Sequence, residues 1–165
     1  MDNDTKMIQR NVLITGGAGF IGHHVIEYIL QNTNWNIVTI DRIDVSSNLE
    51  RLKLVYDSKR VKFIWHDLRA AINKSIIAKI GKIDYILHLA ASTHVDRSIS
   101  NPFEFIQDNI IGTYNVLEYV KRTIPEQYIY FSTDEIFGPA NNGRMYEEWD
   151  RYDSRNPYAA TKAAG

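Results

Sequence analysis

Two groups of residues combine an acid or a base with a spacing that chemistry can use. Tyr158 and Lys162 lie four positions apart, a spacing that stacks two side chains on one face of a helix. An ammonium beside a phenol stabilises the phenolate and lowers the pKa of the tyrosine, which becomes a base able to accept a proton from a hydroxyl group. Because ten tyrosines make this spacing common by chance, an exposed helix start is the alternative.

The second group is the adjacent carboxylate pair in Ser132-Thr133-Asp134-Glu135. Two carboxylates in one pocket repel each other, and unequal burial separates their pKa values, which leaves one as a proton donor and the other as a base. Neighbours on a regular strand face opposite ways, so both can serve one pocket only if the chain curls after Thr133. Otherwise the pair belongs to a solvated loop.

A glycine-rich turn follows the first apolar run, with Gly16, Gly19 and Gly22 at three-residue spacing. Glycine lets the backbone approach a pyrophosphate, and a helix that follows directs its N–H groups and dipole at the phosphates. Asp41 ends the next apolar run, where a carboxylate would bind an adenosine ribose and repel a 2′-phosphate, which favours NAD over NADP. The adjacent Arg42 leaves NADP open, and a tight turn with a solvated aspartate is the alternative to both.

Short apolar runs alternate with segments of helical length along the whole chain. Near-continuous apolar runs are typical of strands covered on both faces, and strand–helix alternation favours right-handed crossovers. The sequence therefore predicts an α/β fold with a Rossmann-type doubly wound parallel sheet, whose ligands lie outside the carboxyl ends of the strands. The predicted strands are 11–15, 35–41, 61–66, 85–90 and 128–133, and the predicted helices are 20–31, 70–80, 103–122 and one from 157, with a possible short helix at 47–56.

Composition excludes several classes of function. The 165 residues hold 19 Lys and Arg against 20 Asp and Glu, and this net charge of −1 argues against nucleic acid or an anionic membrane as a partner. The absence of cysteine excludes disulfides and thiolate metal sites. His23 and His24 have no partnered carboxylate, so we expect no metal site there. Without a run near ~18 apolar residues, the sequence predicts a cytoplasmic, single-domain protein.

Five motifs resemble those of the extended short-chain dehydrogenase/reductases, and among them the nucleoside-diphosphate-glucose 4,6-dehydratases: TGGAGFIG, HLAASTHVDRSI, DNIIGT, STDEIFG and YAATK. The resemblance runs from about Val12 to Gly165. STDE and THVDRS are typical of the dehydratase branch, because the 4-epimerases lack the Asp-Glu pair. The resemblance implies NAD-dependent conversion of a nucleotide-linked glucose to its 4-keto-6-deoxy derivative, in rhamnose-type deoxysugar biosynthesis. Ser92-Thr93 replaces the Glu-Ser of most bacterial members, so dTDP and UDP both stay open as the nucleotide.

The resemblance also implies roles for individual residues. Tyr158 would deprotonate the glucose 4-hydroxyl, Lys162 would tune the phenol and hold the nicotinamide ribose, and Thr133 would bind the same hydroxyl. Glu135 would remove the proton on carbon 5, and Asp134 would protonate the departing 6-hydroxyl. Thr93 would contact the sugar. Residues implied in NAD binding are Gly16, Gly19, Phe20, Ile21, Gly22, Asp41, Asp67, Leu68, Leu89, Ala90, Ala91, Tyr158 and Lys162.

The domain organisation follows from the same resemblance. Residues 1–165 would form the N-terminal part of the NAD-binding domain, and family members are about twice as long. We therefore expect the last strands and the smaller C-terminal substrate domain to lie outside this chain, which alone would be weak or inactive. A homodimer is implied for the full-length protein, with 103–122 and the Tyr–Lys helix in its interface. A nucleotide-sugar 4-epimerase and a noncatalytic NAD-binding module are the alternative functions.

Overall fold

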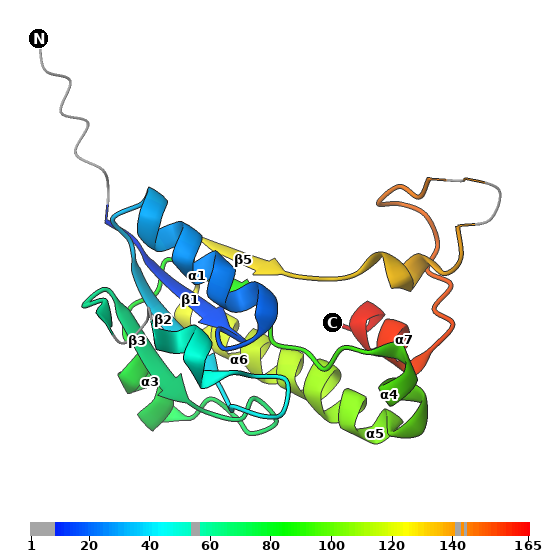
Figure 1. Ribbon diagram of the computed structural model, residues 1–165, viewed down its shortest axis with the longest axis horizontal. Coiled ribbons are helices and arrows are strands. Elements are labelled where there is room, and N and C mark those ends of the chain that lie inside the picture. Colours follow the sequence, from blue (N-terminus) through cyan, green and yellow to red (C-terminus); the bar gives the residue numbers. More distant parts are fainter. Residues whose placement is uncertain (1–8, 54–56, 141–142, 144) are drawn as a thin grey trace, which may run out of the picture.

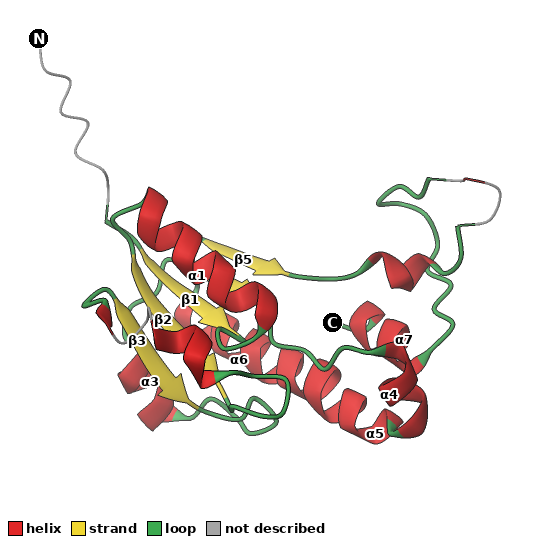
Figure 2. Ribbon diagram, in the orientation of Figure 1, coloured by secondary structure: helices red, strands yellow, loops and turns green. Residues whose placement is uncertain are grey.

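A single parallel sheet organises the computed structural model, which describes residues 9–53, 57–140, 143 and 145–165 (Figures 1 and 2). Within these residues the strand order is β3-β2-β1-β4-β5, and each neighbouring pair is parallel. This order confirms the predicted Rossmann-type sheet. The chain adds β2 and β3 on one side of β1 and then β4 and β5 on the other side, so the order of strand addition reverses between β1 and β4. The strands are β1 (Asn11–Thr15), β2 (Asn36–Asp41), β3 (Val61–Trp65), β4 (Tyr85–His88) and β5 (Gln127–Tyr130).

Helices cover both faces of the sheet, which explains why its strands are apolar on both sides (Figure 2). Val12 and Ile14 pack on the face of α1, with Ile26, whereas Leu13 packs on the opposite face with Val116 of α6. The helices are α1 (Phe20–Asn32), α3 (Lys74–Ile80), α4 (Val95–Ser100), α5 (Pro102–Phe105), α6 (Gly112–Thr123) and α7 (Pro157–Ala163), with the 3₁₀ helices η1 (Leu49–Leu52) and η3 (Asp134–Phe137) and the π-helix η2 (Ile106–Ile111).

Several predicted boundaries differ from those of the structure. The helix predicted at 103–122 consists of α5, the π-helical η2 and α6. The helix predicted from Ala70 begins at Lys74, because Asn73 caps it by accepting hydrogen bonds from two backbone N–H groups. The strand predicted at 128–133 ends at Tyr130, and α4 was not predicted. The possible helix at 47–56 contains η1, which Lys53 follows in α-helical conformation, and positions 54–56 lie outside the described residues.

Two structural features are absent from the described part of the chain. No helix there is long and apolar enough to cross a membrane. In that same part, no three His, Asp or Glu side chains are grouped so that they could hold a metal ion.

Candidate active site

The glycine turn joins β1 to α1 with almost no free space around it. Gly16 has a φ of +76°, and a Cβ added there would lie 2.9 Å from the backbone of Ala90. A Cβ at Gly22 would lie 2.1 Å from the carbonyl oxygen of Gly16, so only glycine lets the helix pack onto the turn. The N-terminus of α1 therefore begins directly at the carboxyl end of β1, the geometry of a phosphate-binding turn.

A cavity of about 110 Å³ opens beside this turn, at the carboxyl ends of β1 to β4. It collects many of the residues expected to bind a dinucleotide: Gly16, Gly19, Asp41, Asp67, Leu68, Leu89, Ala90 and Ala91. The other residues expected to bind the cofactor, namely Phe20, Ile21, Gly22, Tyr158 and Lys162, are not part of its lining. Phe20 is 68% exposed, at the first turn of α1. The structure thus gathers part of the expected cofactor residues in one cavity and leaves the others outside its lining.

Asp41 is buried at the edge of the cavity and holds the glycine turn in place. Its carboxylate accepts hydrogen bonds from the backbone N–H groups of Ala18 (3.0 Å) and Ile43 (2.8 Å) and from the Ser47 hydroxyl (3.1 Å). A carboxylate can accept about four hydrogen bonds, so capacity for one further donor remains. This arrangement fits a ribose hydroxyl as the additional donor.

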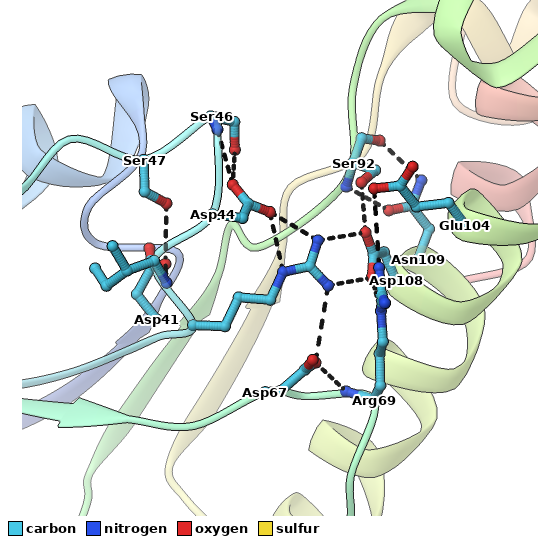
Figure 3. A network of polar contacts seen from close by, with 12 residues as sticks. Asp41, Asp44, Ser46, Ser47, Asp67, Arg69, Ser92, Glu104, Asp108 and Asn109 are labelled. Carbon is cyan, nitrogen blue, oxygen red and sulfur yellow. Dashed lines mark hydrogen bonds and ion pairs between the residues drawn. The ribbon is translucent and has the colours of Figure 1, made fainter. Parts of the chain in front are cut away.

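Charged side chains from three separate segments meet at the mouth of the cavity (Figure 3). Arg42, after β2, forms ion pairs with Asp44 and with Asp108 of η2, and Arg69 also binds Asp108. Burial alone would raise the pKa of Asp108, but hydrogen bonds from Arg42, Arg69 and Ser92 outweigh burial and hold that pKa below its usual range. Sequence reasoning missed Asp108 and Arg69. The signal for Asp108 is its place at the start of the DNIIGT motif, which the family resemblance includes without assigning this residue a role.

The catalytic pair expected on the last helix lies on α7, which contacts α4, α5, η2 and η3 (Figure 1). Pro157 begins the helix, and Asn156 caps it by accepting a hydrogen bond from the N–H of Ala159 at 2.7 Å. Tyr158 is half-buried, with its ring against the edge of Phe105 at 6.4 Å. The phenol therefore has a fixed ring and an accessible side.

Lys162 points inward from α7 and is only 3% exposed. Its ammonium donates a hydrogen bond to the carbonyl of Phe131 at 2.5 Å and lies 4.1 Å from the centre of the Tyr130 ring. Burial lowers the pKa of Lys162 to about 8. Burial, with the nearby Lys162 charge, lowers the pKa of His88 to about 3, so this histidine is neutral between the hydroxyls of Thr15 and Thr113.

The adjacent carboxylates lie in a turn, as the proposed chemistry requires. The chain leaves β5 at Tyr130 and curls into η3, where the Thr133 hydroxyl accepts a hydrogen bond from the N–H of Glu135. Asp134 and Glu135 are both exposed. Asn156 donates a hydrogen bond to the Glu135 carboxylate at 3.1 Å, so the cap of the tyrosine helix also holds the second carboxylate. The two sequence groups that could do chemistry are therefore neighbours in space.

The loop after β4 connects the cavity to the tyrosine helix. Asn109 of η2 is buried and binds both the N–H and the C=O of Ser92, and it also donates to the Thr161 hydroxyl of α7 at 3.0 Å. Thr93, expected to contact a sugar, is exposed immediately after Ser92. His94 has a φ of +85° and directly precedes α4. The π-helical turn thus holds the cavity wall and α7 together.

The strand order, the glycine turn, the acid that ends β2 and the helix bearing Tyr158 and Lys162 define an extended short-chain dehydrogenase/reductase. The family model for GDP-mannose 4,6 dehydratases matches residues 13–165. The chain belongs to this family.

Known proteins of two activities are similar to the chain. The dTDP-glucose 4,6-dehydratase of Shigella flexneri is 37% identical in sequence, over an alignment that covers 93% of this chain and 47% of that protein. The dTDP-glucose 4,6-dehydratase DesIV of Streptomyces venezuelae, solved with NAD and TYD bound, has a TM-score of 0.85 at 30% identity, covering 93% of this chain and 48% of that one. The UDP-N-acetylglucosamine 4-epimerase of Methanobrevibacter ruminantium has a TM-score of 0.83 at 30% identity, covering 96% and 48%. The chain spans about half the length of the dehydratases it matches.

Proposed function

We propose that this chain carries the cofactor site and the acid–base groups of an NAD-dependent nucleoside-diphosphate-glucose 4,6-dehydratase. The product would be a nucleotide-linked 4-keto-6-deoxyglucose, for deoxysugar biosynthesis. The observation that carries the proposal is the hydrogen bond from Asn156 to Glu135, which joins a carboxylate pair to the helix of Tyr158. A hydride transfer alone needs a phenol, whereas an elimination also needs an acid and a base. The similarity to several dTDP-glucose 4,6-dehydratases supports the same activity.

The cavity beside the glycine turn is proposed to receive the adenosine end of NAD. Gly16 and Gly22 leave no room for side chains between turn and helix, so the backbone itself would face the pyrophosphate. Asp41 would accept the ribose hydroxyl, and Asp67 and Leu68 would lie beside the adenine. When bound, NAD supplies a hydride acceptor that later returns the hydride. Lys162, at the other end, would hold the nicotinamide ribose.

Proton transfers are assigned to α7 and η3. Tyr158 would accept the proton of the glucose 4-hydroxyl, with Thr133 bound to the same oxygen. Oxidation at carbon 4 makes the proton on carbon 5 acidic, and Glu135 would remove it. Asp134 would donate a proton to the 6-hydroxyl, so that the bond between carbon 6 and oxygen breaks and water leaves. Carbon 6 then receives the hydride and carbon 5 regains a proton, which Glu135 would return.

Solvent isotope incorporation tests the elimination directly. The complete reading frame that contains these residues is assayed with dTDP-glucose and with UDP-glucose in deuterated water. We expect a 4-keto-6-deoxy product with deuterium at carbon 5, because Glu135 would exchange its proton with solvent. Product without deuterium at carbon 5 would contradict the mechanism. The faster of the two substrates identifies the preferred nucleotide.

A 4-epimerase is the second candidate, because solved 4-epimerases share this fold at similar TM-scores. An epimerase needs Tyr158 and NAD but no elimination. Glu135→Gln separates the two activities: a dehydratase loses turnover, whereas an epimerase retains it. Dinucleotide binding without either turnover would support the third possibility, a noncatalytic NAD-binding module.

We also propose that the full-length protein is a homodimer. Exposed apolar side chains lie along the segment from α5 to α6, which the resemblance places in the interface: Phe103, Ile106, Ile111, Tyr114 and Leu117. A row of this kind favours burial against a second copy. Sedimentation of the Tyr114→Asp variant should show more monomer than the wild type. Tyr28→Asp changes an equally exposed tyrosine on α1 and should leave the dimer intact.

A further inference from the structure

Two residues with opposite preferences for a coenzyme stand next to each other at the end of β2. An acid at this place accepts the ribose 2′-hydroxyl of NAD, whereas an arginine nearby can receive the 2′-phosphate of NADP. Asp41 is the acid, and Arg42 lines the same cavity. The sequence alone leaves the choice between the two coenzymes open, so the contacts of Arg42 decide it.

The guanidinium of Arg42 is occupied on both edges that present two N–H donors side by side. Its Nε and Nη2 donate to Asp44 Oδ2 at 2.9 and 2.7 Å. On the other edge, Nη1 and Nη2 donate to the two Asp108 oxygens at 2.6 and 2.8 Å. Arginine has five N–H donors, and these bonds use four of them. The remaining one belongs to Nη1, which lies 3.8 Å from Asp67.

The cluster is also poor in positive charge. Two arginines, Arg42 and Arg69, face three carboxylates, those of Asp44, Asp67 and Asp108. The side chain of Asp108 is 5% exposed, so water screens its charge little. A 2′-phosphate carries about −1.5 to −2 charges and would meet a cluster with a net negative charge, with Asp41 beside it. The 2′-hydroxyl of NAD meets no such repulsion.

We propose that Asp44 and Asp108 form a clamp that withholds Arg42 from a 2′-phosphate and so makes the cavity selective for NAD. Asp108 is a specificity-determining residue in this arrangement, although it lies 66 positions from Arg42 in the sequence. The clamp rests on the proposed function, because it requires that the cavity binds the adenosine end of a dinucleotide. It adds two carboxylates, of which Asp108 is distant in the sequence, to the selectivity expected from Asp41 alone.

Titration calorimetry with NAD and NADP tests the clamp on the protein made from the complete reading frame that contains these residues. The wild type is compared with Asp44→Asn, Asp108→Asn and the double variant, whose amides keep the shape but lose the charge. We expect the ratio of the NADP to the NAD dissociation constant to fall at least tenfold in the double variant. Adding Arg42→Gln to that variant should restore the ratio, because the released guanidinium would be the group that binds the phosphate.

Controls separate the clamp from general charge and from misfolding. Asp153→Asn removes one charge from an ion pair with Arg155 outside the cavity, and should leave the ratio unchanged. Asp44 is more exposed than Asp108, so Asp44→Asn alone is the milder variant and should lower the ratio about threefold. Thermal unfolding shows whether Asp108→Asn is folded. If it is not, the ratio measured for Asp44→Asn alone decides whether the clamp exists.

Each outcome supports or overturns a stated claim. A wild type that binds neither dinucleotide overturns the proposed cofactor site and the clamp together. A wild type that prefers NAD, with the same ratio in every clamp variant, overturns the clamp and leaves the cofactor site standing. Equal binding of NAD and NADP by the wild type also overturns the clamp. A lower ratio that Arg42→Gln does not reverse shows that repulsion by the carboxylates, and not the withheld arginine, sets selectivity.

Discussion

The cavity at the carboxyl ends of β1 to β4 and the corner formed by η3 and α7 differ in how they are built. At the cavity, a Cβ added to Gly16 or Gly22 would collide with backbone atoms, and Asp41 is held by three donors. At the corner, the carboxylates of Asp134 and Glu135 are exposed. The first region is shaped by the packed fold itself, whereas the second depends on a few side-chain contacts.

This difference separates the effects of substitution in the two regions. A change in the cavity wall disturbs the contact of β1 with α1 and therefore the fold, because close-packed interiors cannot absorb added volume. A change at an exposed carboxylate removes a reacting group and leaves the packing intact. Stability and turnover should therefore respond independently in the two regions.

Glu135→Gln should have the largest effect, confined to turnover. Without a base for the carbon 5 proton, we expect kcat of the complete reading frame to fall about 10²–10⁴-fold. The free energy of unfolding should stay within about 0.5 kcal/mol, because the side chain is exposed and an amide oxygen can still accept from Asn156. Glu147→Gln, another exposed glutamate, is the matched control. Turnover within tenfold of the wild type would remove Glu135 from its assigned role.

Gly22→Ala should show the opposite pattern. The added Cβ would lie 2.1 Å from the Gly16 carbonyl oxygen, so the helix has to move off the turn. We expect the free energy of unfolding in urea to fall by about 3 kcal/mol, with loss of NAD binding. Gly112→Ala places its Cβ at an ordinary 3.5 Å from Leu68 and should stay within about 1 kcal/mol of the wild type. Equal stability of the two variants would contradict the packing argument.

The two regions were also unequally accessible from the sequence. Local rules were sufficient to predict the sheet, because apolar runs and the glycine spacing define each strand–helix unit within about 30 residues. The acid–base chemistry of the carboxylate pair requires a turn after Thr133, and η3 is that turn. Its cause, the Thr133 hydroxyl that accepts from the N–H of Glu135, is local as well.

Contacts between distant segments could not be predicted in the same way. The ion pair of Arg42 with Asp108 spans 66 positions, and that of Arg69 with Asp108 spans 39. Both ion pairs depend on the π-helical turn of η2, which places Asp108. An apolar helical pattern in the sequence does not indicate a π-helical turn. The hydrogen bond from Asn156 to Glu135 likewise requires that η3 and α7 meet, which only the packing of both against their neighbours decides.

The pH dependence of stability sharpens the comparison at Lys162, a buried residue of α7. Burial lowers the pKa of this lysine from 10.5 to about 8, so between these values the unfolded chain binds more protons than the folded chain. Stability should therefore rise with pH above about 8, by at most about 1.4 kcal/mol per pH unit. Unfolding in urea at pH 7.5 and 9.5 measures this rise.

Lys162→Met is the reference for that measurement, because it has no charge to desolvate. The difference in unfolding free energy between wild type and variant should change by about 1–2 kcal/mol in favour of the wild type at the higher pH. The window ends below pH 10, since burial raises the pKa of Tyr130 to about 12 and stability from this group is lost as pH rises past 10. A difference that is constant with pH would show that the ammonium is solvated.

Asn156 should give the smallest effect and isolates the hydrogen bond that joins Glu135 to the start of α7. Asn156→Ala removes both the helix cap and the bond to Glu135, and should cost about 1 kcal/mol of stability. Asn156→Ser keeps a capping oxygen but is too short to hold Glu135, so stability should be retained. If the contact positions the base, both variants lose about tenfold in kcat, equivalent to about 1.4 kcal/mol. If only the helix cap matters, Asn156→Ser restores turnover. The corner is then organised by the capped helix α7 and not by the hydrogen bond from Asn156 to Glu135.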